Sequence, residues 1–258
     1  SEAAVKYFMV GAFSAALMVF GMSLLYGITG TTSIAALTGE GAAALPALPL
    51  AGALFFILAG FGFKLALVPC HVWAPDVYEG APTPITAFLS VAPKAAAFGM
   101  MIRFFQNSTA LHVTGLLAVL SALTMTVGNL AALRQTNIKR LLAYSSVAQM
   151  GYVMMGIVAG GSSGGQSVLI YLAAYILVNL GAFASVIAVG EDAKTESIEG
   201  FSGLASRSLP LALTTTLFLL SLTGIPPLVG FIGKFSLFSA TLQSTGLVWL
   251  AVVGAVNS

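Results

Sequence analysis

Long apolar runs follow one another along almost the whole chain, separated by short stretches rich in glycine, proline and charged residues. Runs of about 20 apolar residues are long enough to cross the hydrocarbon core of a bilayer as α-helices. The pattern predicts eight such segments, at 3–27, 50–78, 84–105, 112–133, 139–160, 167–190, 208–243 and 246 to the end. We therefore expect an all-α, polytopic transmembrane helical bundle that forms a single domain over 1–258.

Two of the predicted segments, 50–78 and 208–243, are too long for one simple helix. The first has Pro69 near its middle, and the second has Pro226 and Pro227. Proline removes a backbone donor and breaks a helix, and the freed groups survive in a bilayer only where protein or water satisfies them. Corresponding interrupted helices are typical of inverted repeats with a transport site near the midplane. Both segments are therefore predicted to be broken helices.

Composition supports the membrane assignment and excludes other classes of protein. Apolar residues make up 58% of the chain and charged residues only 7%, with a mean hydropathy of +1.00, which no soluble domain of this length would have. The net charge of +2 is too small to indicate nucleic-acid binding. The single cysteine, Cys70, leaves no intrachain disulfide and no thiolate metal cluster. The chain opens without methionine and stops inside an apolar run, so we expect a fragment of a longer protein.

Lysine and arginine are shared unequally between the two sides of the predicted bundle. One side receives Lys6, Arg134, Lys139, Arg140, Lys194 and Arg207, whereas the other receives only Arg103. The positive-inside rule predicts that the first side is cytoplasmic, or faces the matrix or stroma in an organelle. The longest polar connection, 190–208, is expected to lie flat on that surface.

Three lysines, Lys64, Lys94 and Lys234, lie inside predicted spans. A charge at the centre of a bilayer costs roughly 2.5 to 3.5 kcal/mol on insertion scales. Lys94 is about ten residues from either end of its segment, so at 1.5 Å per residue its side chain would need to reach about 15 Å to the headgroups. A role in ion or proton movement is therefore the favoured interpretation. For Lys64 and Lys234 the alternative is structural, with the ammonium bonded to backbone carbonyls at the breaks.

Burial disfavours the ammonium form of a lysine, so a chain of buried lysines joined by water could relay protons. No aspartate or glutamate lies in the interior of a predicted span, so any carboxylate partner is expected from missing sequence or another subunit. Lys6, Lys139 and Lys194 lie near segment ends, where reaching the headgroups is a sufficient explanation.

His71 directly follows the first predicted break, and its imidazole titrates near neutral pH. It is a candidate proton-relay group, with a histidine hydrogen-bonded at a helix end as the alternative. Neither histidine of the chain has a second ligand at metal-site spacing, and no phosphate-binding glycine motif follows a strand. We predict no metal site, no bound cofactor and no redox centre in this chain.

Three runs of residues resemble one known family. They are GNLAALRQTNIKRLLAYSSVAQMGY at 128–152, FKLALVPCHVWAPDVYEGAPTP at 63–84 and GIPPLVGFIGKF at 224–235. In their residues and their order along the chain they resemble the antiporter-like membrane subunits of respiratory complex I. Among these they are most similar to the subunit N type, called subunit 2 in mitochondria. The resemblance covers essentially the whole chain, which would be roughly the sixth to thirteenth helices of that family.

The resemblance implies two inverted five-helix repeats with broken seventh and twelfth helices. Residues 1–105 would end the first repeat, and 106–258 would form most of the second. Lys64 would then be the lysine of the seventh helix, Lys94 that of the eighth and Lys234 that of the broken twelfth.

The family's membrane glutamate, on a helix before these, is not in this chain. Glu2 is similar to a second family carboxylate at the start of the sixth helix. Together with Lys6 it is a secondary candidate for the site.

The resemblance also implies a function. The protein would translocate protons as a membrane subunit of NADH-quinone oxidoreductase, while NADH, FMN, iron-sulfur clusters and quinone would bind in partner subunits. The expected partners are the other membrane subunits, neighbouring antiporter-like subunits among them, and the lipid bilayer, with no nucleic acid. The expected membrane is the bacterial inner membrane, otherwise an energy-coupling membrane of an organelle. The alternatives are a cation/proton antiporter subunit that exports sodium and a purely structural membrane subunit.

Overall fold

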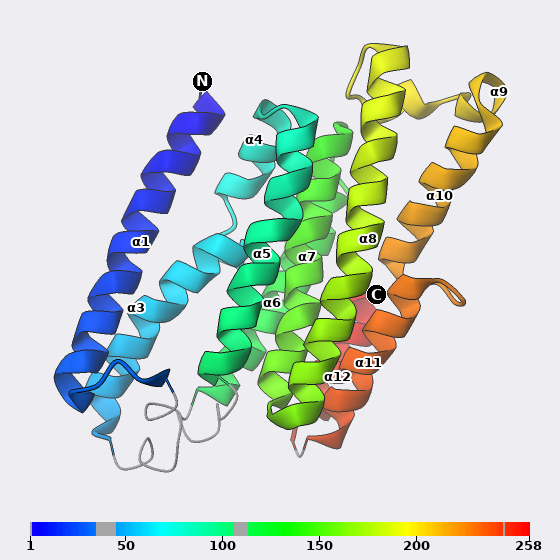
Figure 1. The fold of residues 1–258 in the computed structure, drawn as a ribbon. Coiled ribbons are helices and arrows are strands. Elements are labelled where there is room, and N and C mark those ends of the chain that lie inside the picture. Colours follow the sequence, from blue (N-terminus) through cyan, green and yellow to red (C-terminus); the bar gives the residue numbers. More distant parts are fainter. Residues whose placement is uncertain (1, 35–44, 106–112, 245) are drawn as a thin grey trace.

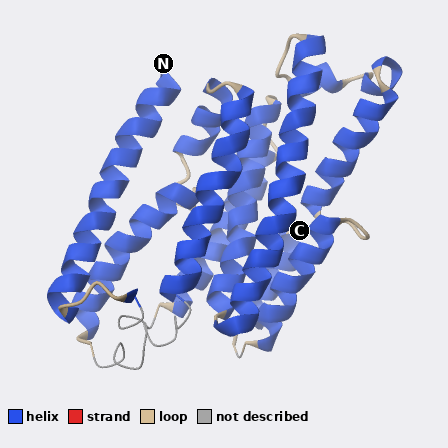
Figure 2. Cartoon of the chain, in the orientation of Figure 1, coloured by secondary structure: helices blue, strands red, loops and turns tan. Residues whose placement is uncertain are grey.

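The computed structural model describes residues 2–34, 45–105, 113–244 and 246–258. Its regular elements are helices, and no β-strand is present in the described residues (Figure 2). The helices are α1 (Glu2–Thr29), α3 (Ala47–Leu65), α4 (Trp73–Gly80), α5 (Thr83–Phe105), α6 (Thr114–Ala132), α7 (Ile138–Ala159), α8 (Gly161–Ala193), η2 (Ile198–Phe201), α9 (Leu204–Arg207), α10 (Leu209–Thr223), α11 (Val229–Gln243) and α12 (Val248–Asn257). Six of them, α1, α3, α5, α6, α7 and α8, are long and apolar enough to cross a membrane. The predicted all-α, multi-pass membrane architecture is confirmed.

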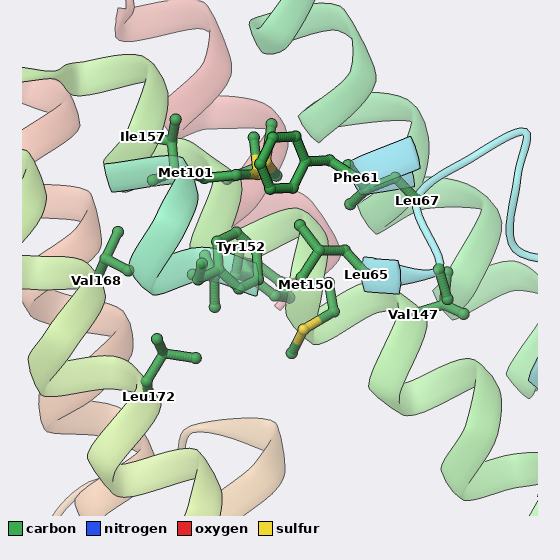
Figure 3. Packing of buried hydrophobic residues seen from close by; sticks show 14 of the residues in the cluster. Phe61, Leu65, Leu67, Met101, Val147, Met150, Tyr152, Ile157, Val168 and Leu172 are labelled. Atoms are coloured by element: carbon green, nitrogen blue, oxygen red, sulfur yellow. The ribbon is translucent and has the colours of Figure 1, made fainter. Parts of the chain in front are cut away.

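The helices run side by side, with α1 at one edge of the bundle and α10 and α11 at the other (Figure 1). α7 is the central element, because it contacts α4, α5, α6, α8, α11 and α12. Figure 3 shows Val147, Met150 and Tyr152 of α7 among buried apolar side chains from other helices. α1 packs against α3 and α4 and leaves much of its surface exposed.

The predicted segments match these helices, with one clear difference at the start of α8. The glycine-rich run was interpreted as a turn, so the helix was expected to begin near residue 167. It begins instead at Gly161. Only Gly160 and Gly161 turn the chain, with φ of 68° and 61°. Gly164 continues the helix and packs so closely on the end of α7 that a methyl group there would overlap the Gly156 carbonyl.

The first predicted break lies between α3 and α4, at residues 66–72, and it includes Pro69. Ala66 has a left-handed φ of 54° and ends α3. Val68 N–H, which the break removes from helical pairing, donates to Thr124 Oγ1 on α6 at 3.1 Å. A neighbouring helix thus satisfies a backbone group that would otherwise be unpaired in the membrane.

The second predicted break lies between α10 and α11, at residues 224–228, and it includes Pro226 and Pro227. Gly224 ends α10 with a φ of 89°, a conformation that glycine adopts without strain. Gly230 lies at the start of α11, so close to α10 that a methyl group there would overlap the Ser221 carbonyl. Both long segments are therefore broken helices, as predicted.

The division of the chain into 1–105 and 106–258 stays a prediction. Residues 106–112, at its boundary, lie outside the described part of the chain. The predicted span 112–133 likewise begins in that stretch, and its described part forms α6.

Two glycines allow the close packing of α6 against α7. A Cβ at Gly128 would lie 2.6 Å from Ala148 N, and one at Gly151 would lie 2.6 Å from Met125 N. Small residues let membrane helices approach in this way. Gly128→Ala should separate the helices and lower the free energy of unfolding by about 1 to 3 kcal/mol, measured by thermal unfolding of the purified full-length protein.

Gly99→Ala is the matched control, because Gly99 lies within α5 and a Cβ there would meet no atom within 4 Å. This substitution should leave stability unchanged or slightly raised, since alanine favours a helix more than glycine does. Equal melting temperatures for the two variants would contradict tight α6–α7 packing at Gly128.

Candidate functional site

Lys94 lies in the middle of α5 and is the most deeply buried of the three candidate lysines, with 1% of its surface exposed. Its Nζ donates to Ser146 Oγ on α7 at 2.5 Å and lies 5.6 Å from the centre of the Tyr78 ring. No carboxylate pairs with it among the described residues. Lys94 therefore occupies an apolar setting in which hydroxyl groups are its polar neighbours.

A chain of hydroxyl groups continues from Lys94 across α7 to α8. Ser146 Oγ lies 2.7 Å from Tyr175 OH on α8. The Tyr175 hydroxyl in turn donates to Ser90 O on α5 at 3.2 Å. Asn179 Nδ2, one turn further along α8, donates to Ser90 Oγ at 2.6 Å. Three helices thus surround Lys94 with a fully buried polar network.

Lys234, on α11, is also buried, with 5% of its surface exposed. Its Nζ donates to Thr223 O, the last carbonyl of α10, at 2.9 Å and to Ser258 Oγ at 3.0 Å. The ammonium lies 4.3 Å from the centre of the Tyr152 ring, within cation–π range. The structural interpretation of Lys234, a bond to a carbonyl at the break, is confirmed, and it does not exclude proton exchange.

A cavity of about 280 Å³ adjoins Lys234. Besides Lys234 itself, its polar lining comprises Asn129, Ser145, Gln149, Tyr152, Thr223, Asn257 and Ser258. A buried water occupies about 30 Å³ and needs two to four polar partners, so this space suits several waters. Water here could exchange protons with the ammonium.

Lys64 differs from the other two lysines, because its side chain is exposed on the last turn of α3. It makes no hydrogen bond or ion pair with any described residue, and its nearest ring is that of its chain neighbour Phe63, at 5.7 Å. Its neighbours Phe63 and Leu65 turn into the core instead. The expectation that the lysines form one buried set is confirmed for Lys94 and Lys234 only.

His71 lies half-buried in the first break, between α3 and α4. Its Nδ1 is buried without a hydrogen-bond partner in the described part of the chain, and its ring centre is 6.5 Å from that of Tyr144. An unpaired imidazole nitrogen suits a group that exchanges protons, and the relay role of His71 stays a prediction.

Glu2 and Lys6, the secondary candidates, belong to an ion-pair network at the end of the bundle. Lys6 pairs with Glu2 at 2.8 Å and with Asp76 of α4 at 2.7 Å. Arg140 of α7 pairs with Asp76 at 2.9 Å and with Glu79 at 2.8 Å. Lys6 therefore differs from the expectation in having carboxylates of α1 and α4 as partners, and its reach toward the headgroups stays a prediction.

Lys139 also differs from expectation. It is 3% exposed, and its Nζ donates to Ala81 O, just past the end of α4, at 2.9 Å and to Glu196 Oε1 at 2.8 Å. It therefore joins α7 to α4 and to the connection after α8, rather than reaching out of the bundle. Lys194 is exposed, as expected for a residue at a segment end.

Reasoning from the sequence missed the polar residues that surround Lys94 and Lys234. They are Ser146 and Gln149 on α7, and Tyr171, Tyr175 and Asn179 on α8. The signal was present, because these residues recur at three- and four-residue spacing within apolar runs and so share one helix face. A polar stripe on two adjacent buried helices indicates a network between them.

No group of three histidine, cysteine, aspartate or glutamate side chains that could hold a metal ion occurs among the described residues. Cys70 is a half-buried free thiol in the first break.

Comparison with known proteins identifies relatives over the whole chain. Residues 1–258 match the family described as NADH:quinone oxidoreductase/Mrp antiporter, TM. NADH-quinone oxidoreductase subunit N of Trichlorobacter lovleyi is 46% identical over 265 residues, which cover 100% of this chain and 54% of that protein. The corresponding subunit of Heliobacterium modesticaldum is 47% identical over 266 residues, covering 100% of this chain and 55% of that protein. The chain spans about half the length of the curated relatives it matches.

Solved structures show the same similarity in three dimensions. A chain of respiratory complex I from Thermus thermophilus with bound aureothin has a TM-score of 0.82 at 40% identity, covering 100% of this chain and 56% of that chain. A chain of the Mrp complex from Dietzia sp. DQ12-45-1b has a TM-score of 0.89 at 28% identity, covering 99% of this chain and 48% of that chain.

Lys94 and Lys139 are both buried, yet only Lys139 forms an ion pair. A buried charge without a counter-ion opposes folding, whereas removing one partner of a satisfied pair leaves the other unpaired. Lys94→Met should therefore leave the melting temperature of the full-length protein unchanged or raise it. Lys139→Met should lower the free energy of unfolding by about 1 to 3 kcal/mol, because Ala81 O loses its donor.

Thermal unfolding of the two purified variants under identical conditions provides the measurement. A loss of stability in Lys94→Met as large as that in Lys139→Met would show that Lys94 is retained for folding.

Proposed function

This chain belongs to the NADH:quinone oxidoreductase/Mrp antiporter transmembrane family, and on that premise we propose that it is the lysine-bearing part of a proton-translocating membrane subunit of NADH-quinone oxidoreductase. The resemblance inferred from the three motifs is confirmed by the relatives, which carry the name subunit N. The observation that carries the proposal is Lys94, fully buried with hydroxyl partners and unpaired with any carboxylate in the described part of the chain. Such a lysine is costly for folding, so its retention favours a functional role.

Lys94 can exchange a proton with its hydroxyl network. An ammonium that donates to Ser146 Oγ can pass a proton to a neighbouring water or hydroxyl and become a neutral amine. Ser146 and Tyr175 connect Lys94 to α8, on the side where α7 and α8 also approach Lys234. In this proposal protons move from Lys64 to Lys94 and then to Lys234, with His71 as an additional relay group in the first break.

The three lysines would have distinct roles. Lys64, exposed in this structure, would receive protons once the rest of the protein or a neighbouring subunit covers it. Lys234, beside a cavity of about 280 Å³, would release protons to water there. Glu2 and Lys6 take part in the ion pairs at the end of the bundle and would support the structure beside the first break.

The electron-transfer chemistry is assigned to partner subunits. NADH, FMN, iron-sulfur clusters and quinone would bind there, and quinone reduction would drive proton movement through this chain. The other membrane subunits, including neighbouring antiporter-like subunits, would be its partners. The membrane would be the bacterial inner membrane, because the relatives compared above are bacterial.

A cation/proton antiporter subunit is the second candidate, because the chain of the Mrp complex has a TM-score of 0.89 with this fold. The same lysines would then couple proton entry to sodium export. Proton translocation that needs sodium, and persists without NADH or quinone, would favour this candidate.

The proposal predicts that Lys94 must release its proton. Guanidinium stays protonated under physiological conditions, so Lys94→Arg keeps the charge but stops proton transfer. In the complete protein within its native complex, both Lys94→Arg and Lys94→Ala should lower proton translocation by at least about tenfold. Proton uptake and quinone reduction, measured together in sealed vesicles, provide the test.

Lys194→Arg is the matched control, because Lys194 is exposed at the end of α8, and it should translocate protons normally. Full activity of Lys94→Arg in an assembled complex would mean that Lys94 acts as a fixed charge, and the relay would fail at this step.

The second break supplies another prediction. Replacing both Pro226 and Pro227 by alanine restores two backbone donors and favours a helix that continues past Thr223. The carbonyl that now accepts from Lys234 would then pair within the helix, so proton translocation per electron should fall although every titratable group remains. The ratio is measured in the assembled complex.

Pro210→Ala is the control, because Pro210 lies in the first turn of α10, where proline fits a helix without breaking it. A normal ratio in the assembled Pro226→Ala, Pro227→Ala double variant would remove this break from the mechanism. Loss of assembly would instead indicate that the two prolines serve packing.

A further inference from the structure

The C-terminal end of α10 has four carbonyls without partners inside the helix, as every helix does. Two of them are satisfied locally, because Gly224 N–H donates to Leu220 O at 3.2 Å and to Ser221 O at 3.1 Å. The last two, Leu222 O and Thr223 O, depend on side chains of other helices. In a membrane, a carbonyl without a hydrogen-bond donor is strongly destabilising.

Leu222 O and Thr223 O have donors of different chemistry. Gln149 Nε2 on α7 donates to Leu222 O at 2.8 Å. Thr223 O accepts from Lys234 Nζ at 2.9 Å and from Ser258 Oγ at 3.4 Å. A carboxamide does not titrate, whereas an amine gains and loses a proton. The hydrogen bond from Gln149 to Leu222 O therefore does not depend on protonation, whereas the one from Lys234 to Thr223 O does.

Gln149 is itself held in one orientation. It is 5% exposed, and its Oε1 accepts a hydrogen bond from Tyr171 OH on α8. With the oxygen engaged by Tyr171, the amide nitrogen faces Leu222 O, which can only accept. Both ends of this buried carboxamide are satisfied, so it forms a fixed connection between α7, α8 and the end of α10.

The hydrogen bonds of Gln149 lie beside those that join Lys94 to Ser146 and Tyr175. Gln149 and Ser146 lie three residues apart on α7, and Tyr171 and Tyr175 lie four apart on α8, so the two pairs occupy successive turns of one interface. Gln149 also lines the cavity next to Lys234. A carboxamide is a poor proton carrier, so its place between the two lysines indicates a geometric role.

From these contacts we propose that Gln149, oriented by Tyr171, is a positioning residue that holds the Leu222–Thr223 end of α10 in place for Lys234. The proposal rests on the proposed function, in which Lys234 transfers protons. When Lys234 gives up its proton or moves toward the cavity, Leu222 O keeps its donor and α10 does not unwind. Thr223 O then remains where the returning ammonium can bind it.

The test uses Gln149→Met in the complete protein within its native complex, because methionine has a similar length but neither hydrogen bond. Hydrogen exchange of the peptide that covers 224–230, whose exchangeable amides are those of 224, 225 and 228–230, is measured by mass spectrometry and reports how often this end of α10 opens. We expect exchange to become at least about fivefold faster, the factor that corresponds to loss of one buried hydrogen bond. Proton translocation per electron should fall at least about threefold, by the same reasoning.

The pH dependence of translocation separates positioning from simple structural support. If Thr223 O moves, the Lys234 ammonium loses an acceptor and the neutral amine is favoured, so the alkaline limb of the profile should move to lower pH. In the described part of the chain, the titratable side chain that lies against the Lys234 ammonium is Tyr152 on α7, and Tyr171 on α8 packs beside the adjacent Gly233.

Ser121→Ala is the matched control. Ser121 Oγ is also a buried donor to a backbone carbonyl, that of Gly151 at 2.7 Å, but it lies at the α6–α7 interface. This variant should leave exchange at 224–230 and the pH profile unchanged. If Gln149→Met does not assemble, Tyr171→Phe, which removes only the hydroxyl, should show the same changes at smaller size.

The outcomes are distinct. Unchanged exchange at 224–230 in the assembled variant overturns the proposal, as does faster exchange with unchanged translocation and an unchanged pH profile. If Lys94 and Lys234 variants translocate protons normally, it is the proposed function that fails, while the exchange experiment still reports whether Gln149 holds the end of α10.

Discussion

The whole arrangement depends on one constraint, which is that every backbone N–H and C=O inside a membrane must find a partner. Helices without an internal proline meet it through their own backbone hydrogen bonds, and α6 to α8 follow this solution. The two broken helices cannot, so α6 supplies Thr124 to the first break, while α7 and α11 supply Gln149 and Lys234 to the second. Polar side chains are thereby placed in an apolar core, and at the second break one of them is Lys234 itself.

Hydropathy predicted the spans and the two breaks, because span length and proline are local properties of the sequence. The burial of Lys94 was likewise predictable from its distance to both ends of its span. Exposure of Lys64 was not, since Phe63, Lys64 and Leu65 are adjacent in sequence and only packing decides which of them faces the core. The spacing of Ser146 and Tyr175 within their apolar runs was visible in the sequence, but their contact was not, because it depends on how α7 and α8 pack.

Burial and pairing together distinguish Lys94 from Lys139. Lys94 and Lys139 have nearly equal exposure, yet one bonds to a hydroxyl and the other to a carboxylate and a carbonyl. The charge of Lys139 is thus compensated by a carboxylate, whereas that of Lys94 has no carboxylate partner among the described residues. Sequence position near a segment end did not reveal this difference for Lys139, because Glu196 approaches it from a distant connection.

The contacts of Lys139 have a mechanical consequence. Its ammonium donates to Ala81 O, just past α4, which follows the first break. It also donates to Glu196 Oε1, on the connection that leads to α10 and the second break. Lys139 thus links the segment that follows the first break to the segment that precedes the second break. A displacement of α4 along its axis would therefore also act, through Lys139, on the connection that leads to α10.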